Sequence, residues 1–344
     1  MGTTRSSRPS VEDVAALASV SLGTVSNVLN RPEKVAGPTR ERVERAMASL
    51  GYVPNSAARS LASGATRNLG LIVSDLANSL FVDIARGAES GAEEHGLDLL
   101  IANSDLRVDR EASQLAMFVE ARVAGVLMTL NDADHYAAVA SNAPRGTPLV
   151  VLNFSAPTSE FCSVDVDNEA GGFLAARHLI EAGRTKLTFV GGPPSLRPVA
   201  DRGVGVRRAV AESPGVSLDV VEPAHINRSD WWEVGKQLAP RIAAGAVDGV
   251  VAASDLLAAG IVQALLGAPG IRVPEDVAVI GYDNNQAAWD SPIPISTIAQ
   301  PGDEVGRLGA ELAVEEARAN GVEHEHRALV LPPRLVARRS STAG

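Results

Sequence analysis

The sequence has a single cysteine, Cys162, and its first ten residues, MGTTRSSRPS, lack the apolar core of a secretion signal. One cysteine excludes an intrachain disulfide framework and is typical of proteins in a reducing compartment. No apolar run approaches the length needed to cross a bilayer. We therefore expect a cytoplasmic protein in which Cys162 is a small buried hydrophobic residue.

Motifs of several enzyme classes are also missing. The sequence has no P-loop and no G-x-S-x-G nucleophile motif, and GVG at 203–205 lacks the third glycine of a dinucleotide-binding loop. From these absences we expect a binding protein without a cofactor rather than an enzyme.

One histidine pair and one acidic pair are explained by exposure to solvent, without a functional role. His324 and His326 are the only close histidines, and a solvated loop explains them better than a metal site does. Glu315 and Glu316 are typical of a solvated helix face. We therefore expect no bound metal.

Charge is distributed unevenly along the chain. The first 66 residues carry eight Lys or Arg against five acidic residues, whereas the remainder carries 23 basic and 36 acidic residues. The net charge of −10 is thus the sum of two unlike parts. The N-terminal part is basic and could bind phosphate, whereas the body is acidic and would repel it.

The N-terminal part predicts three short helices. Ser10 begins the first with a capping-box pattern, and Val14, Leu17 and Ala18 supply its apolar face. Ser21 can cap a second helix, in which Val25, Val28 and Leu29 face inward together with Val20 of the preceding turn. A third helix opens at Pro38-Thr39 and ends at Gly51. The tight turn around Ser19-Val20 makes this a helix-turn-helix bundle.

From residue 69 onward, strands and helices alternate. Near-continuous apolar runs alternate with amphipathic stretches such as 79–96 and 168–184, which predicts parallel sheets covered on both faces. The strand-like runs lie at 69–74, 97–102, 125–130, 148–153, 187–192, 247–254 and 277–283. These are too many for one small sheet, so we expect two doubly wound subdomains divided near 165–168, with ligands outside the carboxyl ends of the strands.

The segments VEDVAALASVSLGTVSNVLN, GYVPNSAARSLASG, LGLIVSDLANSLF, VPEDVAVIGYDN and ISTIAQP resemble, in this order, the lactose/purine-repressor family of bacterial transcription regulators. The resemblance covers nearly the whole chain. It implies a helix-turn-helix head (1–54), a hinge helix and linker (55–66) and a periplasmic-binding-protein-like body (67–344). The expected subdomains of the body are about 67–165 plus 295–325 and about 166–294 plus 326–340.

The resemblance also implies which residues meet DNA. Positions matching Leu22, Gly23 and Asn27 face base edges in the family; the Asn27 amide could read adenine, or it could be too short and contact phosphate or water instead. Leu61 matches a leucine that wedges into the minor groove from the hinge helix. The remaining DNA-binding positions are Ser10, Ser21, Thr24, Ser26, Asn30, Thr39, Asn55 and Ala58.

A small-molecule effector is expected between the two subdomains. Asp283 would accept hydrogen bonds from hydroxyls or ring N–H groups, and Arg202 would donate to ring oxygens or carboxylates; an interdomain ion pair with no ligand role is the alternative. The resemblance adds Phe81, Thr129 and Asn153 on one side of the cleft and Ser254 on the other.

Other positions bear on the effector's chemistry. Leu196 and Pro198 stand where the purine repressor has polar residues, which disfavours a purine and leaves sugars, polyols or related metabolites. Trp231 and Trp232 could form a stacking wall or could belong to a helix core.

The expected mechanism is that of a homodimer on a pseudo-palindromic operator, with effector binding changing the distance between the two hinges. A solute-binding protein of a sugar transporter is the alternative from another class, although the basic three-helix part argues against it.

Overall fold

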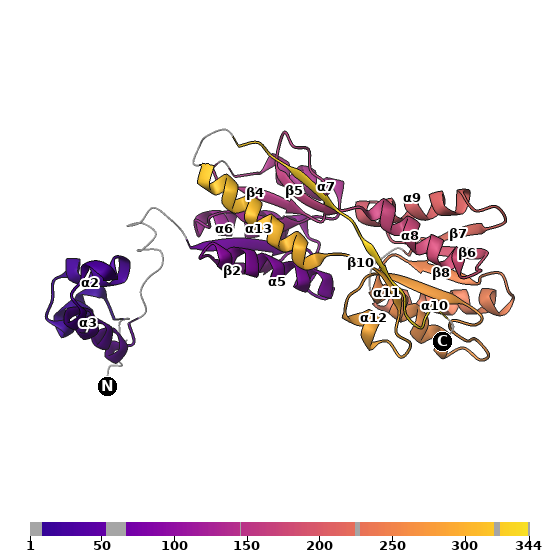
Figure 1. Ribbon diagram of the computed structural model, residues 1–344, viewed down its shortest axis with the longest axis horizontal. Helices are drawn as coiled ribbons and strands as arrows, with labels where there is room; N and C mark the ends of the chain where they lie inside the picture. Colours follow the sequence, from indigo (N-terminus) through magenta and orange to yellow (C-terminus); the bar gives the residue numbers. More distant parts are fainter. Residues whose placement is uncertain (1–8, 53–66, 145, 224–227, 320–323, 343–344) are drawn as a thin grey trace. The chain divides into compact units, whose positions relative to one another are not determined.

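The computed structural model describes residues 9–52, 67–144, 146–223, 228–319 and 324–342 (Figure 1). The chain divides into two compact units, 1–66 and 67–344, which are described separately below. Among the described residues, no helix combines the length and apolar character that a membrane crossing requires.

The first unit has the three expected α-helices. Ser10 caps the first, accepting from the Asp13 backbone N–H while the Asp13 carboxylate accepts from that of Ser10, which is the predicted capping box. Ser19, in the left-handed region with φ 51°, makes the tight turn to the second helix, which Ser21 caps. The elements are α1 (Val11–Ala18), α2 (Leu22–Asn30), the short 3-10 helix η1 (Pro32–Lys34) and α3 (Gly37–Leu50).

A small apolar core holds this head together. Val25 and Val28 of α2 are buried, and Val20 and Leu29 pack against the same core, as predicted. The prediction for Leu17 is wrong, because its side chain is 55% exposed. In so short a helix, α1 turns Ala15 toward the core instead of Leu17.

The body has the predicted α/β architecture of two subdomains. The first sheet is entirely parallel in the order β11-β5-β4-β3-β1-β2. One apolar core lies between this sheet and the helices α5 and α13, and another lies under α6 and α7. The elements are β1 (Asn68–Val73), α5 (Ser79–Glu94), β2 (Asp98–Asn103), α6 (Val108–Glu120), β3 (Val126–Thr129), α7 (Ala133–Ser141), β4 (Leu149–Leu152), β5 (Cys162–Val166), α13 (Gly302–Ala319) and β11 (Ala328–Leu331).

The second subdomain repeats this plan. Its sheet runs β12-β10-β9-β8-β6-β7, parallel except for β12, and the helix pairs α8/α9 and α10/α11 pack with it around one large core. The elements are α8 (Asn168–Glu181), β6 (Lys186–Val190), α9 (Arg197–Ala211), β7 (Ser217–Val221), α10 (Arg228–Ala243), β8 (Gly249–Ala252), α11 (Asp255–Leu266), β9 (Ala278–Asp283), α12 (Gln286–Asp290), β10 (Ser296–Ala299) and β12 (Arg334–Val336).

The chain passes between the subdomains three times, near residues 167, 300–301 and 332–333. The first crossing lies where the sequence predicted it. The expected later boundaries are wrong, because β10 (296–299) pairs with β9 in the second sheet and β11 (328–331) pairs with β5 in the first. In Figure 1, the yellow C-terminal segment can be followed from one subdomain to the other.

Each subdomain contains a pair of helices in close backbone contact. A Cβ at Gly306 of α13 would overlap the carbonyl oxygen of Ile84 in α5, and a Cβ at Gly205 of α9 would overlap that of Glu169 in α8. Only glycine allows helices to approach this closely. These contacts fix the positions of α5 against α13 and of α8 against α9.

Candidate DNA-reading helix and effector cleft

The exposed face of α2 is where the expected base-reading residues lie. Leu22 is 49% exposed, and Gly23 and Asn27 are also exposed. Ser21 and Ser26 share this exposure, whereas Thr24 is half-buried. Leu22, at the start of α2, does not belong to the core of the head, and its contact with DNA stays a prediction.

The other expected DNA contacts divide into two groups. Ser10 and Thr39, near the starts of α1 and α3, are half-buried. The side chain of Asn30 and the residues Asn55, Ala58 and Leu61 lie outside the part of the chain that is described. Their contacts with DNA stay predictions.

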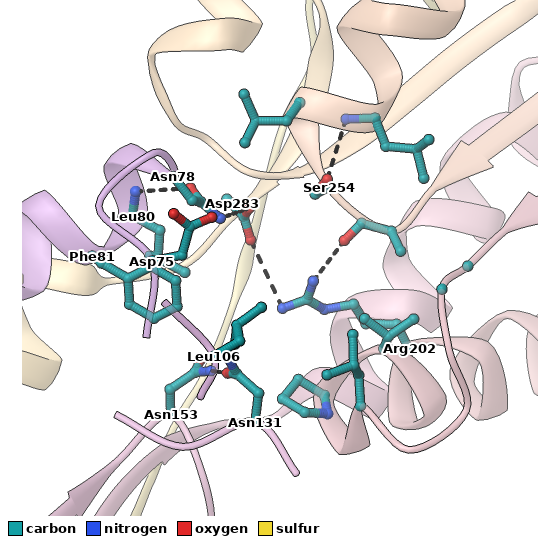
Figure 2. A pocket seen from close by; sticks show the side chains of 18 of the residues that line it. Asp75, Asn78, Leu80, Phe81, Leu106, Asn131, Asn153, Arg202, Ser254 and Asp283 are labelled. Carbon is teal, nitrogen blue, oxygen red and sulfur yellow. Dashed lines mark hydrogen bonds and ion pairs between the residues drawn. The ribbon is translucent and has the colours of Figure 1, made fainter. Parts of the chain in front are cut away.

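A cleft lies between the subdomains of the body, where the carboxyl ends of the parallel strands of both sheets meet (Figure 2). This is the place that doubly wound folds use for ligands. Five of the six predicted effector residues line it, namely Phe81, Asn153, Arg202, Ser254 and Asp283.

Arg202 is the central cation of the cleft. It comes from the second turn of α9 and is only 6% exposed. Its Nε donates to Oδ1 of Asn168 at 2.9 Å, its Nη1 donates to the carbonyl oxygen of Ala253 at 2.6 Å, and its guanidinium stacks on the Tyr282 ring at 3.7 Å. These contacts fix the guanidinium with Nη2 directed toward Asp283, at 3.8 Å from Oδ1.

Asp283 ends β9 with a positive φ of 107°, a strained conformation of the kind that marks functional sites. Its Oδ2 accepts from Nδ2 of Asn78 at 3.1 Å, and its Oδ1 accepts from Nε2 of Gln300 at 2.7 Å. Asn78 belongs to the first subdomain and Gln300 to one of the crossings between the two. The carboxylate is therefore held by groups that move when the subdomains move.

A second carboxyl, Asp255, is fully buried behind Asp283. Burial raises the pKa of Asp255 well above its ordinary range, and the neighbouring charge of Asp283 adds to the rise. Burial also raises the pKa of Asp283, but Arg202, Gln300 and Asn78 oppose that rise. Both carboxyls therefore take up a proton more readily than a solvent-exposed aspartate does.

The wall from the first subdomain combines an aromatic ring with amides. Phe81 lies in the first turn of α5, and Asn153, with a positive φ of 60°, follows β4. Nδ2 of Asn153 donates to Oδ1 of Asn131 at 2.6 Å. Figure 2 shows Asp75, Asn78 and Phe81 on the opposite side of the cleft from Arg202.

The prediction that Thr129 contacts the effector is wrong, because Thr129 is buried and does not line the cleft. Its Oγ1 accepts from the Ser74 backbone N–H at 2.8 Å, so it ties β3 to the end of β1. The cleft-lining polar residues that the sequence interpretation missed are Asp75, Asn78 and Asn131. Asp75 and Asn131 directly follow the expected strand runs 69–74 and 125–130, which was the available signal, whereas Asn78 caps α5.

The second subdomain forms the other wall of the cleft, and only one of the two tryptophans belongs to it. Trp231 of α10 is buried and lines the cleft, whereas Trp232 is 39% exposed and does not. Leu196 and Pro198, at the start of α9, also line the cleft. Ser254 lies at its edge and caps α11, accepting from the Leu257 backbone N–H at 3.2 Å.

Comparisons with known proteins agree with this architecture. Residues 10–55 match the family model "Bacterial regulatory proteins, lacI family", and residues 176–341 match "Periplasmic binding protein-like domain". The HTH-type transcriptional repressor PurR of Aliivibrio salmonicida is 32% identical over 341 residues, which cover 96% of this chain and 98% of the relative. The PurR of Vibrio cholerae is 32% identical over 330 residues, which cover 95% and 96%.

Two solved structures extend the likeness to three dimensions. The transcriptional regulator CelR in complex with cellobiose is 33% identical with a TM-score of 0.69, covering 97% of this chain and all of that one. The lac repressor dimer bound to operator and the anti-inducer ONPF is 25% identical with a TM-score of 0.81, covering 98% and all of that chain. The chain therefore belongs to the lacI family of bacterial regulatory proteins, and it is a DNA-binding transcriptional repressor under the control of a small-molecule effector.

Proposed function

We propose that this repressor binds a sugar or a related polyol in the cleft between its subdomains, and that Asp283 and Arg202 are the polar groups that recognise it. The supporting observation is the buried Arg202–Asp283 pair at the carboxyl ends of both sheets. A carboxylate and a guanidinium that are fixed side by side can accept from and donate to adjacent hydroxyls.

The rest of the lining favours the same class of ligand. Phe81 and Trp231 offer apolar surfaces to the faces of a sugar ring, while the amides of Asn131 and Asn153 can exchange hydrogen bonds with hydroxyls. The transcriptional regulator CelR, which has a similar sequence, forms a complex with the carbohydrate cellobiose. PurR relatives suggest a purine instead, but the apolar Leu196 and Pro198 offer no side-chain hydrogen bond to its ring nitrogens.

We propose that the protein acts in the bacterial cytoplasm as a homodimer. The two heads of the dimer bind a pseudo-palindromic operator. The lac repressor structure is such a dimer on its operator. In this chain, Leu100 and Ile101 of the edge strand β2 and Met117 of α6 are exposed apolar residues that a second copy could cover. We expect Ile101→Asp to shift the sedimentation of the protein from dimer to monomer and to weaken operator binding.

The proposed mechanism couples the cleft to the operator. Effector contacts at Asp283 reach Asn78 across the cleft and Gln300 in a crossing segment, so a ligand that binds one arrangement of the subdomains better will stabilise it. The linker at 55–66 enters the body at the amino end of β1, so a change in subdomain arrangement can be passed to the two heads.

A thermal-shift and calorimetry screen tests the effector class. The panel contains mono- and disaccharides, polyols and purine bases, applied to the wild type and to the Asp283→Asn and Arg202→Lys variants. Arg272→Lys and Asp276→Asn are matched controls, because Arg272 and Asp276 form an ion pair on the surface. We expect a carbohydrate hit that is lost in both cleft variants and kept in both controls.

Other results would change the proposal. Binding of a purine base with the same sensitivity would replace the ligand class but keep the site. A carbohydrate hit retained in both cleft variants would move the site elsewhere. Fluorescence anisotropy with a palindromic duplex, at low and moderate salt, tests the DNA-binding part separately.

A further inference from the structure

Four side chains of metal-binding chemistry lie together in the first subdomain, away from the effector cleft. They are Cys162, Glu316, His324 and His326, and one donor atom from each lies within 4.8 Å of the others. Cys162 is buried, and the other three are half-buried. His324 and His326 thus lie in a loop, as expected, but they are half-buried beside Cys162 rather than fully solvated.

The fold brings these residues together from three segments. Cys162 is the first residue of β5, and Glu316 lies in the last turns of α13. His324 and His326 precede β11, which pairs in parallel with β5; the Ser163 backbone N–H donates to the carbonyl oxygen of Arg327 at 2.9 Å. Strand pairing thus places the histidines next to Cys162, more than 160 residues away in the sequence.

Three of the six separations between the donor atoms are close to those around a tetrahedral metal ion. Sγ of Cys162 lies 3.3 Å from Nε2 of His324 and 3.7 Å from Nδ1 of His326. Nδ1 of His326 lies 3.9 Å from Oε2 of Glu316. Ordinary zinc–sulfur, zinc–nitrogen and zinc–oxygen bond lengths put neighbouring ligands of a tetrahedral site about 3.4–3.6 Å apart. Small side-chain rotations would therefore complete the geometry.

The carboxylate of Glu316 is available for this role. Within the described residues, its buried Oε2 has no hydrogen-bond donor. The nearby guanidinium of Arg327 pairs with Glu315 instead. The backbone N–H of Arg327 donates to Sγ of Cys162 at 3.4 Å, a contact of the kind that orients and stabilises a ligating thiolate.

We propose that Cys162, Glu316, His324 and His326 bind one transition-metal ion, with Zn²⁺ as the natural occupant. A sulfur and two imidazoles select Zn²⁺ or its neighbours over Mg²⁺ and Ca²⁺, which take oxygen ligands. Four protein ligands leave no open position, so the site is structural. On binding, the Cys162 thiol loses its proton to solvent.

The site is open to solvent on one side, and it lies at the amino edge of the first sheet. A cavity lined by Thr147, Phe161, Glu316 and the two histidines opens beside it to solvent. Cys162 begins β5 at the amino edge of the sheet, the same edge at which β1 starts directly after the linker. A bound ion would join α13, β5 and the segment before β11 at that edge, opposite the effector cleft.

Metal titration of the full-length, untagged protein tests the proposal. After treatment with a chelator, the protein is titrated with Zn²⁺ in competition with a chromophoric chelator, and separately with Co²⁺. We expect one equivalent per chain, a sulfur-to-cobalt charge-transfer band, and the intense visible bands of tetrahedral Co²⁺. Zn²⁺ should also raise the melting temperature, because it binds only the folded chain.

Single substitutions assign the ligands. His324→Ala and His326→Ala should each weaken Zn²⁺ binding by more than about tenfold, and Cys162→Ser should abolish the charge-transfer band. His95→Ala is the matched control, because His95 lies at the end of α5 and contacts Arg318 rather than the cluster. The proposal is overturned if the wild type binds no Zn²⁺, or if His324→Ala and His95→Ala bind it equally well.

Discussion

Asn78 and Asn285 join the two subdomains across the effector cleft, although they are 207 residues apart: Nδ2 of Asn285 donates to Oδ1 of Asn78 at 3.0 Å. The neighbouring backbone N–H of Gln286 donates to Oγ of Ser79 at 3.0 Å. Both bonds join the start of α5 to the start of α12. They act as a latch that stabilises the arrangement of the subdomains seen here.

Asn285→Ser should weaken this latch while keeping a good helix cap, because serine can still cap α12 but cannot reach Asn78. Losing one hydrogen bond of about 1 kcal/mol should favour more open arrangements and weaken effector binding by up to about fivefold. Small-angle scattering of the ligand-free protein and calorimetry with the effector measure the two effects. Asn142→Ser, at the end of α7, is the control; an equal change there would contradict the latch.

Gly306→Ala should destabilise the first subdomain, because the new Cβ overlaps the carbonyl oxygen of Ile84 and forces α13 away from α5. We expect a loss of about 1–3 kcal/mol in the free energy of unfolding, measured by urea denaturation. Gly267→Ala at the end of α11 adds a methyl group in ordinary contact, at 3.4 Å from the nearest atom. Similar losses in both variants would show that α5 and α13 do not pack this closely.

Asp165→Asn should stabilise the protein at neutral pH. Burial raises the pKa of Asp165 from 3.8 to about 6. A carboxyl with a raised folded-state pKa favours the folded state below pH 3.8, and this contribution is lost as the pH rises through about 6. The asparagine variant should gain about 1–3 kcal/mol at pH 7 and no such gain at pH 3.5. Urea melts at several pH values measure it; a gain that does not change with pH would contradict the role of ionisation.

Asn27→Ala should relax operator preference at one base pair if its amide reads adenine, with a loss of about 1–3 kcal/mol of discrimination there. Selection from a randomised duplex pool measures this preference. Ser26→Ala is the matched control, because loss of a phosphate contact should weaken binding to all sequences alike. An unchanged preference in Asn27→Ala would show that the residue contacts phosphate or water.

The strands of the body could be predicted largely from the sequence, and their membership in sheets could not. All seven expected apolar runs form strands, because buried parallel strands need continuous apolar sequence. Five strands were missed: β7, β11 and β12 are partly exposed edge strands, and β5 and β10 are short buried strands inside the sheets. The exchange of β10 and β11 between subdomains depends on pairing partners far along the chain, which local patterns do not encode.

The two sites were predictable to different degrees. Arg202 and Asp283 were found through the family resemblance, and the structure brings them together. Asn78 was missed because an asparagine before a helix is explained well enough as a cap. The cluster around Cys162 escaped notice because its cysteine and histidines become neighbours only when β11 joins β5. Spacing rules for metal sites detect ligands close in sequence, and this set is not.

The three crossings between subdomains have a consequence for synthesis on the ribosome. The first subdomain takes its helix α13 and its edge strand β11 from residues that emerge after nearly all of the second subdomain. The nascent first subdomain therefore cannot complete its fold until residue 331 has left the exit tunnel. Until then, the face of its sheet that α13 covers stays exposed. Both subdomains are therefore completed only near the end of the chain, by β11 and by β12, so late translation is a stage at which incomplete subdomains are exposed to aggregation.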